Sequence, residues 1–530
     1  MSIAFGYIAT HNHFVLDQGG KLFDRHGTVI KLPQSATVRE HLALLGLLNS
    51  STACFWMKQV SEPKSGWTEF WEARFEFDGS KLKDFPIPAA CPTDLAQQIH
   101  EHASARAALL PQKLYANGVP DSKLLEESRL KAEEHHEAMV ALQEELDWKS
   151  YQIFGITQQG FTCTEGVIPG IRFGERAFEL VMARRMDVGD IEGNWFDRHG
   201  VKPRLELPAH WSAEYCRIVE KRMALIENDE KVQLLEQPEY KRRWVTKPWR
   251  EQHADVLREW LLDRIECSDV WQEARLVSCA YLADRLREDV LFAEVAGRFR
   301  GRPDFEWSSL VVELLEPDAT PLLTSLRFTP SGLQKRGVWE RVWDLQRTED
   351  RIQVAVQSDD TIPELAKGDQ LAERKRTEVG PIPPPPHYDA GDYQRPTYWQ
   401  LRGKLDLPKE RFITFPFCGR DADPTPVIGW AGWDQLQQAQ AIAAYYERVK
   451  NYEGWAPHRR VPLLTGIVEL LPWLKQWHND IHPEYQDRMG EFFQQFVEDE
   501  ARTMEMTLDE IRHWTPPAQS SARGRRNRNT

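Results

Sequence analysis

ALLGLLNSSTACFWMKQV, from Ala43 to Val60, and KLKDFPIP, from Lys81 to Pro88, are the most informative segments in the first part of this chain. Thr37 and Glu40 precede the first stretch with the spacing of a helix capping box. The polar triplet at residues 49–51 interrupts the helical spacing with side chains that can bond to backbone groups. We therefore expect a buried helix that begins after Thr37 and ends or bends at this triplet.

The segments on both sides of this helix favour strands. Residues 5–18 are rich in β-branched and aromatic side chains, and turns are expected at Gly19–Gly20 and at His26–Gly27. Residues 67–79 alternate well enough for a further strand, and the prolines of FPIP end regular structure there. Residues 1–90 thus predict a small α/β module.

Helical patterns dominate the residues that follow. One helix is expected to open at Thr93 and Asp94, and another to span Lys123–Ile156. In the second helix an apolar residue recurs every seven positions, at Leu125, Ala132, Met139 and Leu146, which is typical of helices that pack lengthwise. Residues 91–156 are therefore predicted to form a helical spacer hairpin.

The rest of the chain predicts two further folded parts and a linker. Amphipathic stretches at 210–228, 249–266 and 268–289 predict a helical domain over residues 157–347. Residues 348–395 are polar and proline-rich, which is typical of a linker, and residues 396–518 predict a small C-terminal α/β domain. Residues 519–530 are expected to be a basic, disordered tail. The predicted fold class is mixed α+β, predominantly helical.

Composition excludes several classes of protein. The 530 residues, of which 41% are hydrophobic, suffice for several cores. The seven cysteines form no CxxC pair, which argues against a disulfide framework and a zinc ribbon. No segment is long and apolar enough to span a membrane, and the N-terminus lacks the pattern of a signal peptide. We expect a soluble protein of the cytoplasm with no membrane partner.

The formal net charge of -14 is unfavourable for a protein that binds nucleic acid. A local basic face can still attract DNA to an acidic protein. The basic clusters in the sequence lie at residues 241–243, at Arg459 and Arg460, and in the tail at residues 523–529. Net charge alone therefore does not decide the question.

The pairing of LNSS with FPIP resembles the target-recognition region shared by type I specificity subunits and fused type IIG enzymes. Further segments are similar to the C-terminal region of the phage-growth-limitation and BREX adenine-specific DNA methyltransferases. They are ALQEELDWKSYQIFGI (141–156), GERAFELVMARR (174–185), WFDRHG (195–200), ELPAHW (206–211), PEYKRRW (238–244), GLQKRGVWERVWDLQRTED (332–350), YWQLRGKLDLPKERFITFP (398–416) and GWAGWD (429–434). As a set, they extend the resemblance over nearly the whole chain.

The resemblance implies S-adenosylmethionine-dependent, site-specific methylation of adenine for the family. That chemistry needs an Asn-Pro-Pro-aromatic loop for the flipped adenine and a glycine-containing turn for the cofactor, and the sequence contains neither. Because the recognition-like module begins near the first residue, we expect the catalytic domain and its S-adenosylmethionine to lie outside this chain. We predict no catalytic residue and no cofactor site here, and no methylation by this chain alone.

Without the catalytic motifs, the function that we expect of this chain is recognition of double-stranded DNA. In such recognition, basic and amide side chains contact phosphates and read base edges. An ordinary solvated charge is the alternative for each candidate, and burial in a core is the alternative for Trp56, Trp67 and Trp71, which flank the reading surface. The candidate DNA-binding residues are Lys21, Arg25, Lys31, Lys58, Gln59, Lys64, Lys241, Arg242 and Arg243.

Other chemistry is less well supported. Glu239 and Lys241 have the ExK spacing of metal-dependent nucleases, with Asp229 nearby, but this spacing is common by chance. The histidine pairs at residues 11 and 13 and at residues 135 and 136 lack the further ligands that a metal site needs, so we predict none. The expected partners besides DNA are a separate methyltransferase catalytic chain or other defence-system proteins. An interaction protein that has lost DNA binding is the competing hypothesis.

Overall fold

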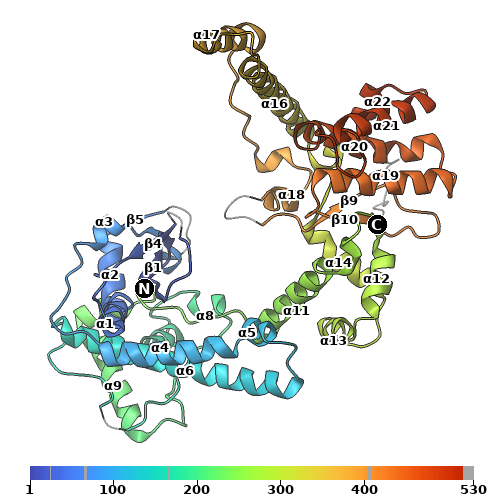
Figure 1. Ribbon diagram of the computed structural model, residues 1–530. Helices are drawn as coiled ribbons and strands as arrows, with labels where there is room; N and C mark the ends of the chain where they lie inside the picture. The colour runs from blue at the N-terminus through green and yellow to red at the C-terminus, as the bar shows by residue number, and fades with distance from the viewer. Residues whose placement is uncertain (24–25, 65–68, 165, 404–407, 517–530) are drawn as a thin grey trace, which may run out of the picture. The chain divides into compact units, whose positions relative to one another are not determined.

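The computed structural model describes residues 1–23, 26–64, 69–164, 166–403 and 408–516 (Figure 1). The chain divides into two compact units, Met1–Val256 and Leu257–Thr530. Helices predominate, and the strands form small sheets. The predicted fold class, mixed α+β and predominantly helical, is therefore confirmed.

Two small sheets open the first unit. Strand β1 (Ser2–Gly6) lies between β3 (Phe14–Asp17) and β4 (Gly27–Ile30) and is antiparallel to both. Phe5 and Phe14 are paired in register, and their rings lie 4.9 Å apart in the core. The second sheet has the order β2-β6-β5, with bounds Ile8–Ala9, Phe75–Glu76 and Glu62–Pro63. The strands predicted in residues 1–30 are thus present.

The helix that follows is divided at the polar triplet, as the sequence predicts. Thr37 and Glu40 form the capping box of α1 (Val38–Leu48). Asn49 ends this helix, and Ser50 caps α2 (Ser51–Val60) by accepting the Ala53 N–H group. The triplet therefore supplies the C-cap of α1 and the N-cap and first residue of α2.

The strand predicted over residues 67–79 is wrong for most of its length. Residues 67 and 68 lie outside the described part of the chain, residues 70–72 form the 3-10 turn η1 (Phe70–Glu72), and only β6 is a strand. Trp71 in this turn is 8% exposed and packs 5.1 Å from Trp195. Tertiary packing of this indole overrides the local alternation. Helix α3 (Gly79–Leu82) follows, and FPIP carries no helix or strand, as expected.

The predicted helical hairpin is confirmed. Helix α4 (Thr93–Leu109) packs along α6 (Ser122–Ile153), and the short helix α5 (Pro111–Ala116) lies in their connection (Figure 1). Helix α1 lies close to α4 at Gly46. A Cβ atom added to this glycine would lie only 2.6 Å from the Ala96 Cβ atom. The module therefore packs on the hairpin through α1.

The remaining helices of the first unit contribute to a core around the last turns of α6. Trp148 and Tyr151 of α6 share this core with Phe178, Trp195 and Tyr215. The helices concerned are α7 (Ala177–Asp187), α8 (Trp195–Arg198), α9 (Ala213–Asn228) and α10 (Glu230–Leu235), and α11 (Trp249–Glu266) crosses the boundary between the units.

The second unit contains a sheet that the sequence does not predict as one sheet. Its order is β7-β10-β9-β8, with bounds Val277–Ser278, Val427–Trp430, Phe412–Thr414 and Ala319–Pro321. Strand β8 pairs in parallel with β9, and β7 pairs antiparallel with β10. Strands from before and after residues 348–395 thus share one sheet, so the predicted division between a helical domain ending at 347 and a separate domain starting at 396 is corrected here.

The helix predicted over residues 268–289 begins later than expected. A 3-10 turn, η2 (Asp269–Trp271), and strand β7 precede α12 (Cys279–Arg287). The reason is the pairing of Val277 with Ile428, which places both buried side chains in the sheet. The next helices are α13 (Val290–Arg300), α14 (Trp307–Leu315) and α15 (Thr324–Arg327).

Part of the predicted linker is helical. Helix α16 (Pro330–Gln357) extends away from the sheet and carries α17 (Glu364–Arg374) at its far end (Figure 1). The prolines at residues 383–386 lie in a segment without helix or strand. The helices α19 (Gln435–Asn451), α20 (Pro457–Trp477) and α21 (Met489–Thr503) lie where the sequence predicts helices. The short helices α18 (Pro396–Gln400), at the start of a stretch that is expected to form strands, and α22 (Leu508–Arg512) were not predicted. Among the described residues no helix is long and apolar enough to cross a membrane.

Candidate nucleic-acid interface

A buried ion cluster lies where the recognition-like module meets α6. The Lys241 ammonium group is fully buried, and it lies 2.8 Å from a Glu236 oxygen, 3.0 Å from Asp147 and 3.3 Å from Glu144. Burial alone would lower the pKa of Lys241, but the carboxylates of Asp147, Glu144 and Glu236 outweigh it and raise the pKa. The lysine therefore remains charged inside the protein.

The polar triplet joins this cluster to the module. Asp147 accepts hydrogen bonds from the Ser51 backbone N–H (2.8 Å) and from the Ser51 hydroxyl group (2.6 Å). The Asn49 side chain donates to the Phe14 carbonyl (3.0 Å) and accepts the Phe14 N–H (3.0 Å), which fastens the helix end to β3. The segment LNSS thus links a strand, two helices and the spacer helix through satisfied polar contacts.

A second group of basic side chains lies beside the triplet. We call His11, His13, Lys58, Arg242 and Arg243 the basic cluster. Arg242 donates to the Asn49 Oδ1 atom (3.3 Å) and lies 3.4 Å from the His13 Nδ1 atom. Arg243 donates to the Trp71 carbonyl group, and its guanidinium lies 4.5 Å from the centre of the Trp71 ring. In the described part of the chain neither arginine forms an ion pair with a carboxylate.

The positive charges of the basic cluster are incompletely balanced. Burial lowers the pKa of Arg242 to about 10. Burial, followed by the charges of Arg242 and Arg243, lowers the pKa of His11 to about 3, and burial with the charge of Arg242 lowers the pKa of His13 to about 4. The two histidines are therefore neutral near pH 7, and the positive charge lies on Lys58, Arg242 and Arg243. A bound anion would offset the repulsion among these three, and a phosphate group is the anion that a nucleic acid supplies.

The structure brings together five of the candidate DNA-binding residues. Lys58 donates to the Glu239 carbonyl (2.7 Å), and the Gln59 amide lies 3.5 Å from the Tyr240 hydroxyl, so the end of α2 packs on the segment that contains residues 241–243. Lys58 is 4% exposed and Lys241 is 1% exposed, so the prediction that these two side chains face DNA is corrected by their burial. Arg242 and Arg243 are half-buried and remain accessible in part.

The other candidates lie elsewhere. Lys64 forms an ion pair with Glu76, and Lys21 and Lys31 are exposed. Arg25, Trp67 and the basic tail at residues 523–529 lie outside the described residues. The other basic cluster in the sequence consists of Arg459 and Arg460. Arg459 forms an ion pair with Asp421, and Arg460 is buried against Tyr446.

Sequence reasoning missed the roles of His13 and Asn49. The sequence suggests His13 only as a possible metal ligand, and it predicts that Asn49 can bond to backbone groups without identifying Phe14 or Arg242 as its partners. The adjacent cations in PEYKRRW point to this region of the chain. The residues that contact these cations are distant in sequence, so they cannot be identified from the motif. Trp71 is buried and Trp56 packs 5.2 Å from Phe85, which fits the core alternative.

Metal and nuclease chemistry gain no support in the described residues. No group of three or more histidine, cysteine or acidic side chains there could hold a metal ion. His135 instead faces His102, with their Nδ1 atoms 2.9 Å apart. Lys241 of the ExK triplet is held by the buried carboxylates described above.

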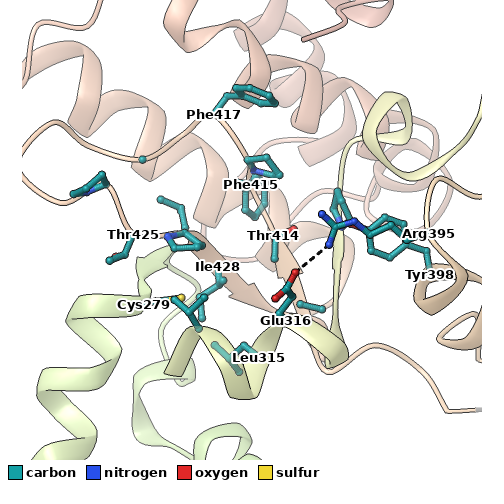
Figure 2. Close-up of a pocket in the computed structure, with 18 residues that line it drawn as sticks. Cys279, Leu315, Glu316, Arg395, Tyr398, Thr414, Phe415, Phe417, Thr425 and Ile428 are labelled. Carbon is teal, nitrogen blue, oxygen red and sulfur yellow. Dashed lines mark hydrogen bonds and ion pairs between the residues drawn. The ribbon is translucent and has the colours of Figure 1, made fainter. Parts of the chain in front are cut away.

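The second unit has a cavity of about 420 Å³ at the sheet (Figure 2). Its walls are largely apolar, with Leu315, Phe415 and Ile428 among the side chains that line it. Arg395 and Glu316 lie at one side and pair with each other at 3.2 Å. Burial raises the pKa of the Cys279 thiol to about 12, so it stays protonated and unreactive near neutral pH. This thiol is therefore not an activated nucleophile.

Comparison with known proteins gives two matches. The model of a family described as a domain of unknown function (DUF7008) matches residues 139–527. The adenine-specific methyltransferase PglX of Streptomyces coelicolor is 41% identical over an alignment that covers 98% of this chain and 43% of that protein. The chain thus spans less than half the length of this curated relative. No solved structure matches the chain. The likeness to adenine-specific methyltransferases predicted from the sequence is confirmed.

Proposed function

We propose that this chain, which belongs to the DUF7008 domain family, is the DNA-specificity portion of an adenine-specific DNA methyltransferase of a phage-defence system. In this role the first unit binds duplex DNA and presents it to a catalytic domain outside the chain. S-adenosylmethionine would be held by that catalytic domain, and the partners would be double-stranded DNA and a catalytic chain or other proteins of the defence system.

The similarity to the PglX methyltransferase over nearly the whole chain supports a role related to adenine-specific DNA methylation. The observation that carries the DNA-binding role is the position of Arg242. Its guanidinium lies 4.8 Å from the centre of the Trp244 ring and is held by Asn49 of the recognition-like module. A planar guanidinium that is fixed on an aromatic ring is preorganised for bidentate contact with a phosphate or a guanine edge.

The division of labour within the junction follows from burial. Lys241 and its carboxylates hold the module against α6, while Arg242 and Arg243, next in sequence, keep part of their surface toward solvent. One lysine thus fixes the backbone from which two arginines contact DNA. Base-specific contacts would come from the loops of the module, among whose exposed cations are Lys21 and Lys31.

Binding of the intact chain to a mixed-sequence duplex, measured across salt concentrations, tests this function. We expect an affinity that falls as salt rises, because phosphate contacts release counterions. The net charge of -14 favours the competing role of a scaffold protein without DNA binding. Absence of duplex binding at low salt, with and without the catalytic partner, would favour that role and overturn the proposal.

A further inference from the structure

A groove of about 900 Å³ lies in the second unit, remote in sequence from the basic cluster. Residues 344–351 of α16 form one wall, and residues 468–477 of α20 form the other, with α21 and α22 completing it. We call it the Trp477 groove. Its chemistry differs from that of the largely apolar cavity in Figure 2, because several cations, among them Arg351, Lys475 and Arg512, line it beside an exposed indole.

Trp477 is the most exposed part of a tryptophan cluster. Its indole ring is 56% exposed, and it stacks on Trp473 with ring centres 5.0 Å apart and ring planes 18° apart. Trp473 in turn contacts Trp339 (5.3 Å) and Trp343 (5.9 Å) of α16. The inner rings hold Trp477 in a fixed orientation, so a flat apolar face of its ring is exposed to water. This exposed face contributes no hydrophobic stabilisation.

The cations of the groove exceed its anions. Arg351, Lys475 and Arg512 line it, and in the described part of the chain none of them forms an ion pair. Arg347 is paired with Asp344, and Asp350 accepts a hydrogen bond from Gln346. A chain with a net charge of -14 therefore keeps a local excess of positive charge beside an exposed indole.

We propose that the Trp477 groove binds an unpaired nucleic-acid strand. A base would stack on the Trp477 ring, and the adjoining phosphates would lie against Arg351, Lys475 and Arg512. This combination of a stacking surface with backbone-directed cations is how proteins hold single strands without regard to sequence.

Charge and shape favour a single strand over other anions. In a duplex each base is covered by its neighbours, so its face is not available to an indole ring. An acidic peptide would use the cations but leaves the flat surface of Trp477 without a matching partner. The proposal goes beyond duplex recognition by the first unit, and it does not depend on that function.

Fluorescence anisotropy with a labelled oligothymidylate of about 12 nucleotides, a length typical of single-strand sites, tests the proposal on the full chain at low salt. We expect binding that weakens about tenfold in Trp477→Ala and is largely recovered in Trp477→Phe, because stacking on one base contributes this much. The double variant Arg351→Gln/Lys475→Gln should weaken binding and flatten its salt dependence. Arg341→Gln, on α16 but outside the groove lining, is the matched control and should bind like the parent.

Three results would overturn the proposal. The first is a chain that does not bind the oligothymidylate at low salt. The second is equal binding by the parent and Trp477→Ala, and the third is equal competition by polyglutamate, because either would show that the groove binds negative charge without stacking a base. Arg242→Gln/Arg243→Gln should retain single-strand binding, which separates this outcome from that of the proposed duplex function.

Discussion

Ser51 gives two hydrogen bonds to Asp147, one from its backbone N–H at 2.8 Å and one from its hydroxyl group at 2.6 Å. The first residue of α2 is thereby tied to a carboxylate ninety-six positions later, in the C-terminal part of the spacer helix. The same carboxylate contacts the Lys241 ammonium group at 3.0 Å. The segment that first suggested a recognition module thus also fixes the position of residues 241–243.

Ser51→Ala should destabilise the first unit. The substitution removes a hydroxyl donor to a buried, charged acceptor, and bonds of this kind contribute about 1.5–3 kcal/mol. The free energy of unfolding from urea titration measures the loss. Ser122→Ala, at an exposed serine near the start of α6, is the control and should change little. Equal stability of the two variants would contradict the role given to this hydrogen bond.

Lys241→Met should destabilise the protein more strongly. It leaves the carboxylates of Glu144, Asp147 and Glu236 buried without their cation, and breaking a buried ion pair in this way costs about 3–5 kcal/mol. Adding Glu236→Gln should recover part of the loss, because it removes one of the unpaired charges. Denaturant unfolding of the single and double variants measures both effects. If Lys241→Met lowers the free energy of unfolding by less than about 1 kcal/mol, the role given to this ion cluster is contradicted.

Stability should fall as pH falls from about 6.5 toward 3, in part through His11. In the folded protein the pKa of His11 is lowered to about 3, whereas an unfolded histidine has a pKa of about 6.5. The unfolded state therefore binds the proton first, so the contribution of His11 is present above pH 6.5 and is lost on acidification.

His11→Gln should make this acid limb less steep. Burial raises the pKa of Glu144 to about 7, so its contribution has the opposite sign and is lost as pH rises from about 4.5 to 7. Both proteins carry Glu144, so the difference between their unfolding free energies isolates His11. Parallel curves for the parent and the variant would show that His11 does not titrate as described.

Gly46→Ala should separate α1 from α4. The added Cβ atom would lie 2.6 Å from the Ala96 Cβ atom, and overpacking of this kind costs about 1–3 kcal/mol. Ala96→Gly in the same chain should relieve the clash and recover part of the stability. Thermal unfolding of the two variants tests this. No gain in the double variant would mean that the helices do not meet at these residues.

Local signals in the sequence predicted much of the fold. The capping box of Thr37 and Glu40, the break at residues 49–51 and the hairpin of α4 and α6 all depend on residues close in sequence. The sheet of the second unit does not. Its strands have two to four residues and come from positions 277 to 430, so no window of sequence contains the pairing that stabilises them.

The candidate site shows the same limit. The run of cations at residues 241–243 is evident in the sequence, but their burial depends on partners far away. Lys241 faces carboxylates of α6, whereas Arg242 faces His13 and Asn49. Adjacent cations in one tripeptide thus have different roles, and only the tertiary structure distinguishes them.

The most direct test of the central claim compares duplex binding by the parent chain, by Arg242→Gln/Arg243→Gln and by the control Arg217→Gln, whose arginine is exposed on α9. Equilibrium binding across salt concentrations gives the slope of log affinity against log salt. We expect the double variant to bind more weakly and its slope to fall by about 0.9 for each phosphate that its side chains no longer neutralise, while the control matches the parent. Equal affinity and slope in all three proteins, with each shown to be folded, would contradict the account.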